Sequence, residues 1–298
     1  MAPASGGAAC WNARMVERTR ILGPALVAAL AGLLCWASFS AASTTKTDTA
    51  SLGQVQAKLT YTQNGPYDYS DVHIQIDRAG HTVLDGPVPA PCSQCMIIPA
   101  GAPAGISSLQ VVDLEHDGEP EVIVDLFTGG AHCCTLSVIY GYHSATDTYT
   151  HRTQDWRDPG YNLVDIDHDG RPEFRSSDAR FAYEFTAYAF SAFPIQIWHY
   201  SAGSMIDVTK SFPDLVRRDA KAKRAQYRHL KAAHYDVRGA VAAYAADEYR
   251  LGRGAVGMRL VDRAFRDGLL HGPKGDVAPS GRKYIKRLRS FLRSLHYR

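Results

Sequence analysis

The chain has 298 residues, of which 45% are hydrophobic and 21% charged, with a formal net charge of +3. This length suits one large domain or two ordinary ones, and the composition excludes a largely disordered chain. The small net charge is the sum of two parts of the chain that carry opposite charges. Residues 44–204 hold 8 Lys/Arg and 20 Asp/Glu, a balance of −12, whereas residues 205–298 hold 22 and 9, a balance of +13. This asymmetry predicts two domains with surfaces of opposite charge.

Residues 1–42 have the pattern of a targeting segment. Three arginines precede an uncharged run over 21–42, which ends in small residues suited to a cleavage site. A signal peptide is one interpretation. A retained membrane anchor is the other, because the run is just long enough to span a bilayer. Starts at Met1 and at Met15 both fit, and either way the rest of the chain is expected outside the cytoplasm, secreted or in the cell envelope.

Four cysteines follow the targeting segment, in two close couples: Cys92 with Cys95, and Cys133 with Cys134. An even number of cysteines in an exported domain indicates two disulfides. We expect bonds between the couples rather than within them, because a vicinal ring at Cys133–Cys134 is strained. Which cysteine meets which stays open. A zinc site built from the same four thiols is the alternative.

The remaining chain predicts an α+β protein. Residues 43–53 are polar and small, as in a linker, and 54–209 read as an antiparallel β domain with an aromatic run over 181–200 forming one or two strands. The clearest expected strands cover 72–76, 109–112, 122–124 and 136–140. Residues 210–298 read as a basic helical domain, an antiparallel bundle or short solenoid. Its expected helices cover 214–233, 237–251, 255–270 and a stretch from 282.

An internal repeat is the most informative feature. The segments LQVVDLEHDGEPEVIV (109–124) and NLVDIDHDGRPEF (162–174) each place D-x-[DE]-x-D-G-x-P-E between two short strands. The first loop offers Asp113, Glu115, Asp117, Glu119 and Glu121. The second loop offers Asp165, Asp167, Asp169, Arg171 and Glu173.

The spacing in both loops suits Ca²⁺. This ion takes six to eight oxygen ligands, and a tight loop can present carboxylates at positions 1, 3 and 5. Gly118 and Gly170 at position 6 permit the turn. Position 7 (Glu119 or Arg171) would contribute its backbone carbonyl, and position 9 (Glu121 or Glu173) a last carboxylate. The alternative is an acidic turn that binds no metal.

The two loops resemble those of FG-GAP/VCBS repeats, the blades of integrin-α-like β-propellers. This resemblance covers 109–125 and 162–178, and more loosely DLFTGGAHCC and FPIQIW resemble uncharacterised exported bacterial proteins that carry such repeats. The family implies blade-like antiparallel sheets with calcium at the matching acids. Two loops are fewer than the four blades of a full propeller, which favours an incomplete propeller or a sandwich.

No catalytic motif is present, since the chain lacks G-x-S-x-G, H-E-x-x-H and a phosphate-binding glycine loop. We therefore expect a non-enzymatic, calcium-binding exported protein that binds a partner or acts as a scaffold. A cell-envelope hydrolase with an unrecognised site is the alternative. The basic last helix is an ordinary solvated face, a surface for an anionic envelope polymer or lipid, or a docking face for the acidic half or another protein. Nucleic acid is not expected, and membrane contact only through the first 42 residues.

Overall fold

A computed structural model describes residues 43–90, 96–101, 107–132 and 135–297. Residues 1–42, expected to be a targeting segment, and all four cysteines of the expected disulfides lie outside these residues. Residues Ala41–Arg298 form one compact unit. Among the described residues, no helix is long and apolar enough to cross a membrane.

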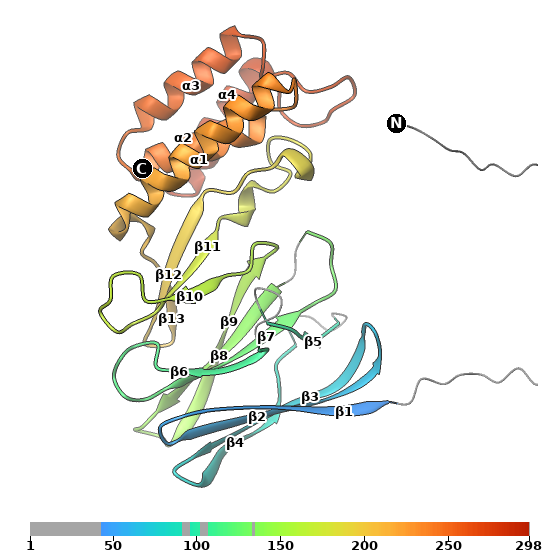
Figure 1. Cartoon of the computed structure of the whole chain (residues 1–298), viewed down its shortest axis with the longest axis vertical. Helices are drawn as coiled ribbons and strands as arrows, with labels where there is room; N and C mark the ends of the chain where they lie inside the picture. The colour runs from blue at the N-terminus through green and yellow to red at the C-terminus, as the bar shows by residue number, and fades with distance from the viewer. Residues whose placement is uncertain (1–42, 91–95, 102–106, 133–134, 298) are drawn as a thin grey trace, which may run out of the picture. The chain divides into compact units, whose positions relative to one another are not determined.

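The first sheet is an antiparallel meander in the order β1-β2-β3-β4 (Figure 1). Its strands cover Thr44–Leu52, Val55–Gly65, Asp68–Arg78 and His81–Pro87. Strand β1 corrects the expectation of a linker over 43–53. The segment is polar but rich in threonine, a β-branched residue that favours strands, and it pairs with β2 from Thr44↔Gln63 to Leu52↔Val55. The sequence reads as a linker because this edge strand faces solvent along most of its length.

The second sheet is also antiparallel, in the order β5-β7-β8-β9, with β6 paired to β7. Its strands cover Ile98–Pro99, Leu109–Val112, Glu121–Phe127, Thr135–His143 and Thr148–Arg157. Strand β7 is buried on both faces. Val122 and Val124 pack against the first sheet, whereas Ile123 packs against the third. This sheet is therefore the middle layer of three.

The third sheet has the order β10-β11-β12-β13. Its strands cover Asn162–Val164, Glu173–Ser177, Ile195–Ser201 and Ser204–Asp207. The aromatic run expected as strand over 181–200 is strand only from Ile195. Before it lie two 3₁₀ turns, at Ala179–Phe181 and Tyr188–Phe190, and Phe181 and Phe185 join the core of the helices. Phe181 and Phe185 therefore serve packing without strand geometry, whereas Tyr183 of the same run is 58% exposed.

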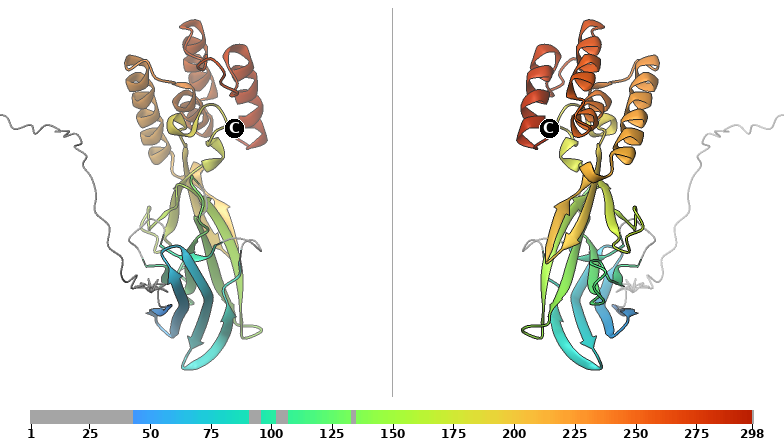
Figure 2. Two further views of the ribbon diagram at one scale, coloured as in Figure 1. Left: turned by 90° about the vertical axis from the view of Figure 1, so that its right-hand side faces the viewer. Right: turned by 90° about the vertical axis from the view of Figure 1, so that its left-hand side faces the viewer.

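Four helices follow: α1 (Pro213–Ala232), α2 (Arg238–Arg250), α3 (Gly254–Arg266) and α4 (Gly281–Ser294). They lie together beyond the third sheet (Figure 2). Successive helices pack on one another, and 11 of the 13 residues of α2 are buried. Gly257 allows the close approach of α3, because a Cβ there would lie 2.9 Å from the Cα of Ala245. The architecture is α+β with antiparallel sheets. The antiparallel bundle and the domain boundary at 209/210 stay predictions, and the described strands form no closed propeller.

A buried carboxyl group without a hydrogen-bond donor among the described residues lies inside the helical part. Asp247 of α2 is 0% exposed, and neither of its carboxylate oxygens has a hydrogen-bond donor in the described part of the chain. Burial and then the neighbouring Asp219 of α1 raise the pKa of Asp247 well above its ordinary value, although Lys223 and Arg250 offset part of this rise. In its protonated form Asp247 can donate to Asp219.

Asp247→Asn is expected to stabilise the protein at pH 8, by about 1–3 kcal/mol, because the amide carries no buried charge. A raised folded-state pKa contributes stability that is full below the unfolded pKa of about 4 and is lost as the pH rises through the folded value. The gain should therefore vanish at pH 4. Thermal melting at both pH values measures it, with Asp262→Asn on α3 as control. Equal melting of Asp247→Asn and the unsubstituted protein at pH 8 would disprove this account.

Candidate metal centre

The two Asp-rich loops fold alike. One joins β6 to β7 and the other joins β10 to β11. The carboxylate of Asp113 accepts the N–H groups of Asp117 at 3.1 Å and Gly118 at 2.9 Å. Asp165 accepts the N–H groups of the equivalent two residues at 3.2 and 3.1 Å. Positions 4 and 6 have positive φ in both loops. The sequence repeat is therefore also a structural repeat.

The closing acid of each loop is buried. Glu121 and Glu173 are 4% and 3% exposed, and each accepts the N–H of the residue at position 2 at 2.9 Å. Burial, with a smaller effect of Glu115 and Asp117, raises the pKa of Glu121 to about 8. Burial and the neighbouring aspartates of its loop also raise the pKa of Glu173. A bound cation would favour the ionised form of both groups.

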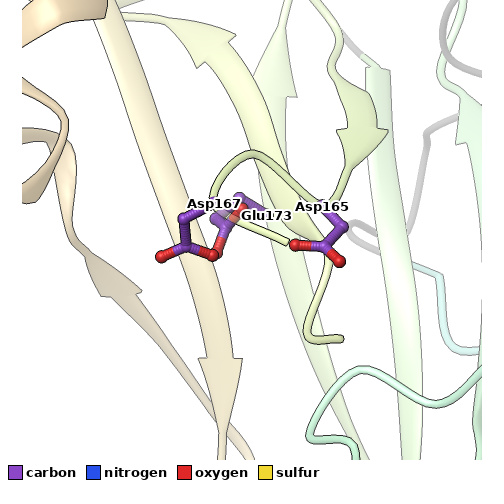
Figure 3. A group of neighbouring side chains, drawn as sticks. All are labelled: Asp165, Asp167 and Glu173. Atoms are coloured by element: carbon purple, nitrogen blue, oxygen red, sulfur yellow. The ribbon is translucent and has the colours of Figure 1, made fainter. Parts of the chain in front are cut away.

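The second loop brings three acids together, as Figure 3 shows. Asp165, Asp167 and Glu173 each offer an oxygen, and these atoms all lie within 4.8 Å of one another. The carboxylate of Asp169 is not part of this group. It accepts the backbone N–H of Arg171 at 2.8 Å and pairs with the guanidinium of that residue at 2.7 Å. Three of the four expected carboxylates thus converge. Their hard oxygen donors match the chemistry of Ca²⁺, and the remaining ligands would be backbone carbonyl groups and water.

The first loop uses its acids for contacts with other parts of the fold. Glu115 accepts the N–H of Ala202 at 2.9 Å, in the turn between β12 and β13. The side chain of Glu119 pairs with Arg78 of β3. The described residues form no convergent acidic group in this loop. The sequence pattern shows neither partner, because Ala202 and Arg78 are distant in the chain and carry no local signal.

The two loops lie side by side. A Cβ at Gly170 would come within 2.8 Å of the His116 ring, and the φ of Gly170 is +91°. The backbone conformation therefore favours glycine at position 170, and the missing side chain leaves room for the imidazole of the other loop. The charge of His116 also contributes to the lowered pKa of Asp169, after the larger effect of the hydrogen bonds from Arg171. A residue of the first loop thus lies against position 6 of the second loop and lowers the pKa of the aspartate at position 5.

Comparison with known proteins points to a different family from the one that the loops suggested. Residues 216–296 match a family model described as the sll0997 C-terminal domain. The chain is 32% identical over 162 residues to the probable thylakoid lumen protein sll0997 of Synechocystis, covering 51% of this chain and 46% of that protein. It is 36% identical over 91 residues to the uncharacterized protein y4bJ of Sinorhizobium fredii, covering 30% and 14%. The chain thus spans less than half the length of either relative. No solved structure shows significant similarity to it.

The resemblance to FG-GAP/VCBS repeats is therefore wrong. The matching family model describes the helical segment, and no FG-GAP or VCBS repeat is found. The loops suggested the wrong family because D-x-D-x-D-G between two strands is a local motif. Different folds can use this motif to make the same turn. Here the two copies belong to different sheets of a layered structure.

Proposed function

We propose that this is an extracytoplasmic, non-enzymatic binding or scaffold protein whose second Asp-rich loop holds one Ca²⁺ ion. The convergence of Asp165, Asp167 and Glu173 carries the calcium part. The description of the Synechocystis relative as a probable thylakoid lumen protein supports the location, since a thylakoid lumen is an extracytoplasmic compartment. The targeting pattern of the first 42 residues supports it as well.

Calcium would stabilise the junction of the second and third sheets. Glu173 opens β11, and the next residue, Phe174, is 0% exposed and stacks on Trp156 of β9 with ring centroids 5.3 Å apart. An ion bound by Glu173 would thus fix a strand end that is continuous with the core. Three acids in this space repel one another without a cation, which is a second reason for stabilisation by the ion.

The melting temperature of the protein is expected to rise with calcium. At millimolar Ca²⁺ and the affinities of extracellular modules, one site adds about 0.4–1.4 kcal/mol, or about 1–5 °C. Asp167→Asn should abolish this rise, because it removes one converging carboxylate that has no other partner in the described structure. Calcium titration followed by thermal melting and metal analysis measures both effects.

The first loop supplies a matched control. Glu115→Gln changes position 3 of that loop in the same way, but Glu115 contacts Ala202 rather than a group of acids. The calcium-dependent rise should therefore survive Glu115→Gln. A protein that melts identically in calcium and in EDTA would refute the metal site. Calcium at the first loop stays a prediction.

A further inference from the structure

Helix α4 carries a row of cations on one face. Arg282, Lys286, Arg289 and Arg293 are spaced i, i+4, i+7 and i+11, which places them in one line along the helix, and all four are exposed. At 1.5 Å rise per residue, this α4 cationic row is about 16 Å long. The opposite face packs into the core through Tyr284, Leu288, Phe291 and Leu292.

No acid balances the α4 cationic row. The sequence has no Asp or Glu after Asp276, and none of the four cations forms an ion pair within the described part of the chain. Helix α1 provides the contrast. Its row at the same spacing is Arg217, Lys221, Arg224 and Arg228, and in this row Arg217 pairs with Asp214. Among the described helices, α4 thus has the longest row at this spacing in which no cation forms an ion pair, and a shorter one lies on α3 at Arg259, Arg263 and Arg266.

The unbalanced charge works against the helix itself. Like charges at i, i+3 and i, i+4 destabilise a helix by about 0.2–0.5 kcal/mol for each pair. Arg282 also lies in the first turn, where the helix dipole favours anions, and the N-cap Ser280 makes no side-chain hydrogen bond there. A bound anion would remove both penalties. An ordinary solvated helix face mixes the two signs and has no such need.

We infer that the α4 cationic row binds a linear, phosphate-bearing polymer outside the cytoplasm. A chain of regularly spaced phosphates matches a single row, and guanidinium groups bind phosphate oxygens well. A lipid surface fits less well. The apolar side of α4 is already used by the core, so the helix has nothing to insert into a bilayer, and one row offers few simultaneous contacts to a plane. The inference rests on the proposed binding role and is independent of calcium.

Fluorescence anisotropy with labelled inorganic polyphosphate tests this on the chain that follows the targeting segment. The unsubstituted protein should bind with a strong salt dependence. Replacing the four residues of the row with glutamine should weaken binding at least tenfold and reduce the slope of log affinity against log salt by about 3, at roughly 0.7 for each lost contact. The fold should persist, since repulsion is removed, and thermal melting checks this. Measurements in EDTA keep the result separate from the calcium site.

A matched variant changes four exposed cations of the β sheets to glutamine. These are Lys46, Lys58, Arg152 and Arg175. It should bind polyphosphate like the unsubstituted protein. Equal weakening by both variants would overturn the inference, because general charge would then explain binding. Binding to phosphatidylglycerol vesicles without binding to polyphosphate would overturn it in favour of a lipid. Salt-sensitive self-association without polyphosphate binding would overturn it in favour of the acidic half of a second copy.

Discussion

Arg238→Ala is expected to destabilise the protein by about 3–5 kcal/mol, the usual effect of leaving buried charges without their partner. The Arg238 side chain is 0% exposed and pairs with Asp236 at 2.6 Å and with Asp276. It also donates to the carbonyl of Pro279 at 3.1 Å. One guanidinium thus ties the start of α2 to the loop before α4. Urea unfolding followed by circular dichroism at 222 nm measures the loss.

Two further variants separate buried charge from lost packing. Arg217→Ala removes an exposed pair with Asp214 and should cost less than about 1 kcal/mol. Arg238→Met combined with Asp236→Asn and Asp276→Asn should recover part of the stability, because no unpaired charge then stays buried. If Arg238→Ala costs as little as Arg217→Ala, the ion-pair account of this junction fails.

Elements with strong periodicity could be predicted from the sequence. Strand β6 covers 109–112 as expected, and in α4 Tyr284, Leu288 and Phe291 share the buried face that their spacing predicts. Helix α1 covers Pro213–Ala232, one residue from the expected 214–233 at each end. In each case the local pattern and the tertiary environment favour the same structure.

The errors arose where the tertiary environment decides. Strand β1 has little apolar character, and its strand geometry comes from pairing with β2. The aromatic run over 181–200 alternates like a strand, but Phe181 and Phe185 are buried among the helices. Predictions from a single segment miss both results.

The candidate site also has features that follow from the local sequence and features that depend on the tertiary environment. The turn geometry of both loops follows from local residues, so the repeat predicted it. Whether the acids converge depends on distant groups: the N–H of Ala202 engages Glu115 of the first loop, whereas Asp165, Asp167 and Glu173 of the second loop meet one another. The local sequence of each loop does not predict such distant partners.

Asp125→Ala is the second substitution with a large expected effect, again about 3–5 kcal/mol. Asp125 is 0% exposed in the middle of β7, where it accepts hydrogen bonds from Tyr161 at 2.9 Å, Gln110 at 3.3 Å and the hydroxyl of Ser137. Trp156 donates to that hydroxyl at 2.7 Å. Removing the carboxylate leaves several buried donors without an acceptor. Asp155→Ala, at an exposed position of β9, should cost less than about 1 kcal/mol and serves as control.

This buried network also supports the second loop, which makes the prediction specific. The Tyr161 ring packs on Phe174 with centroids 4.9 Å apart, and Phe174 follows the proposed ligand Glu173. Asp125→Asn and Tyr161→Phe should therefore weaken calcium binding as well as stability. Because the two residues share hydrogen bonds, their effects on unfolding should be coupled by about 0.5–3 kcal/mol in a double-mutant cycle. Strictly additive losses with unchanged calcium affinity would show that the network holds the two sheets together without positioning the loop.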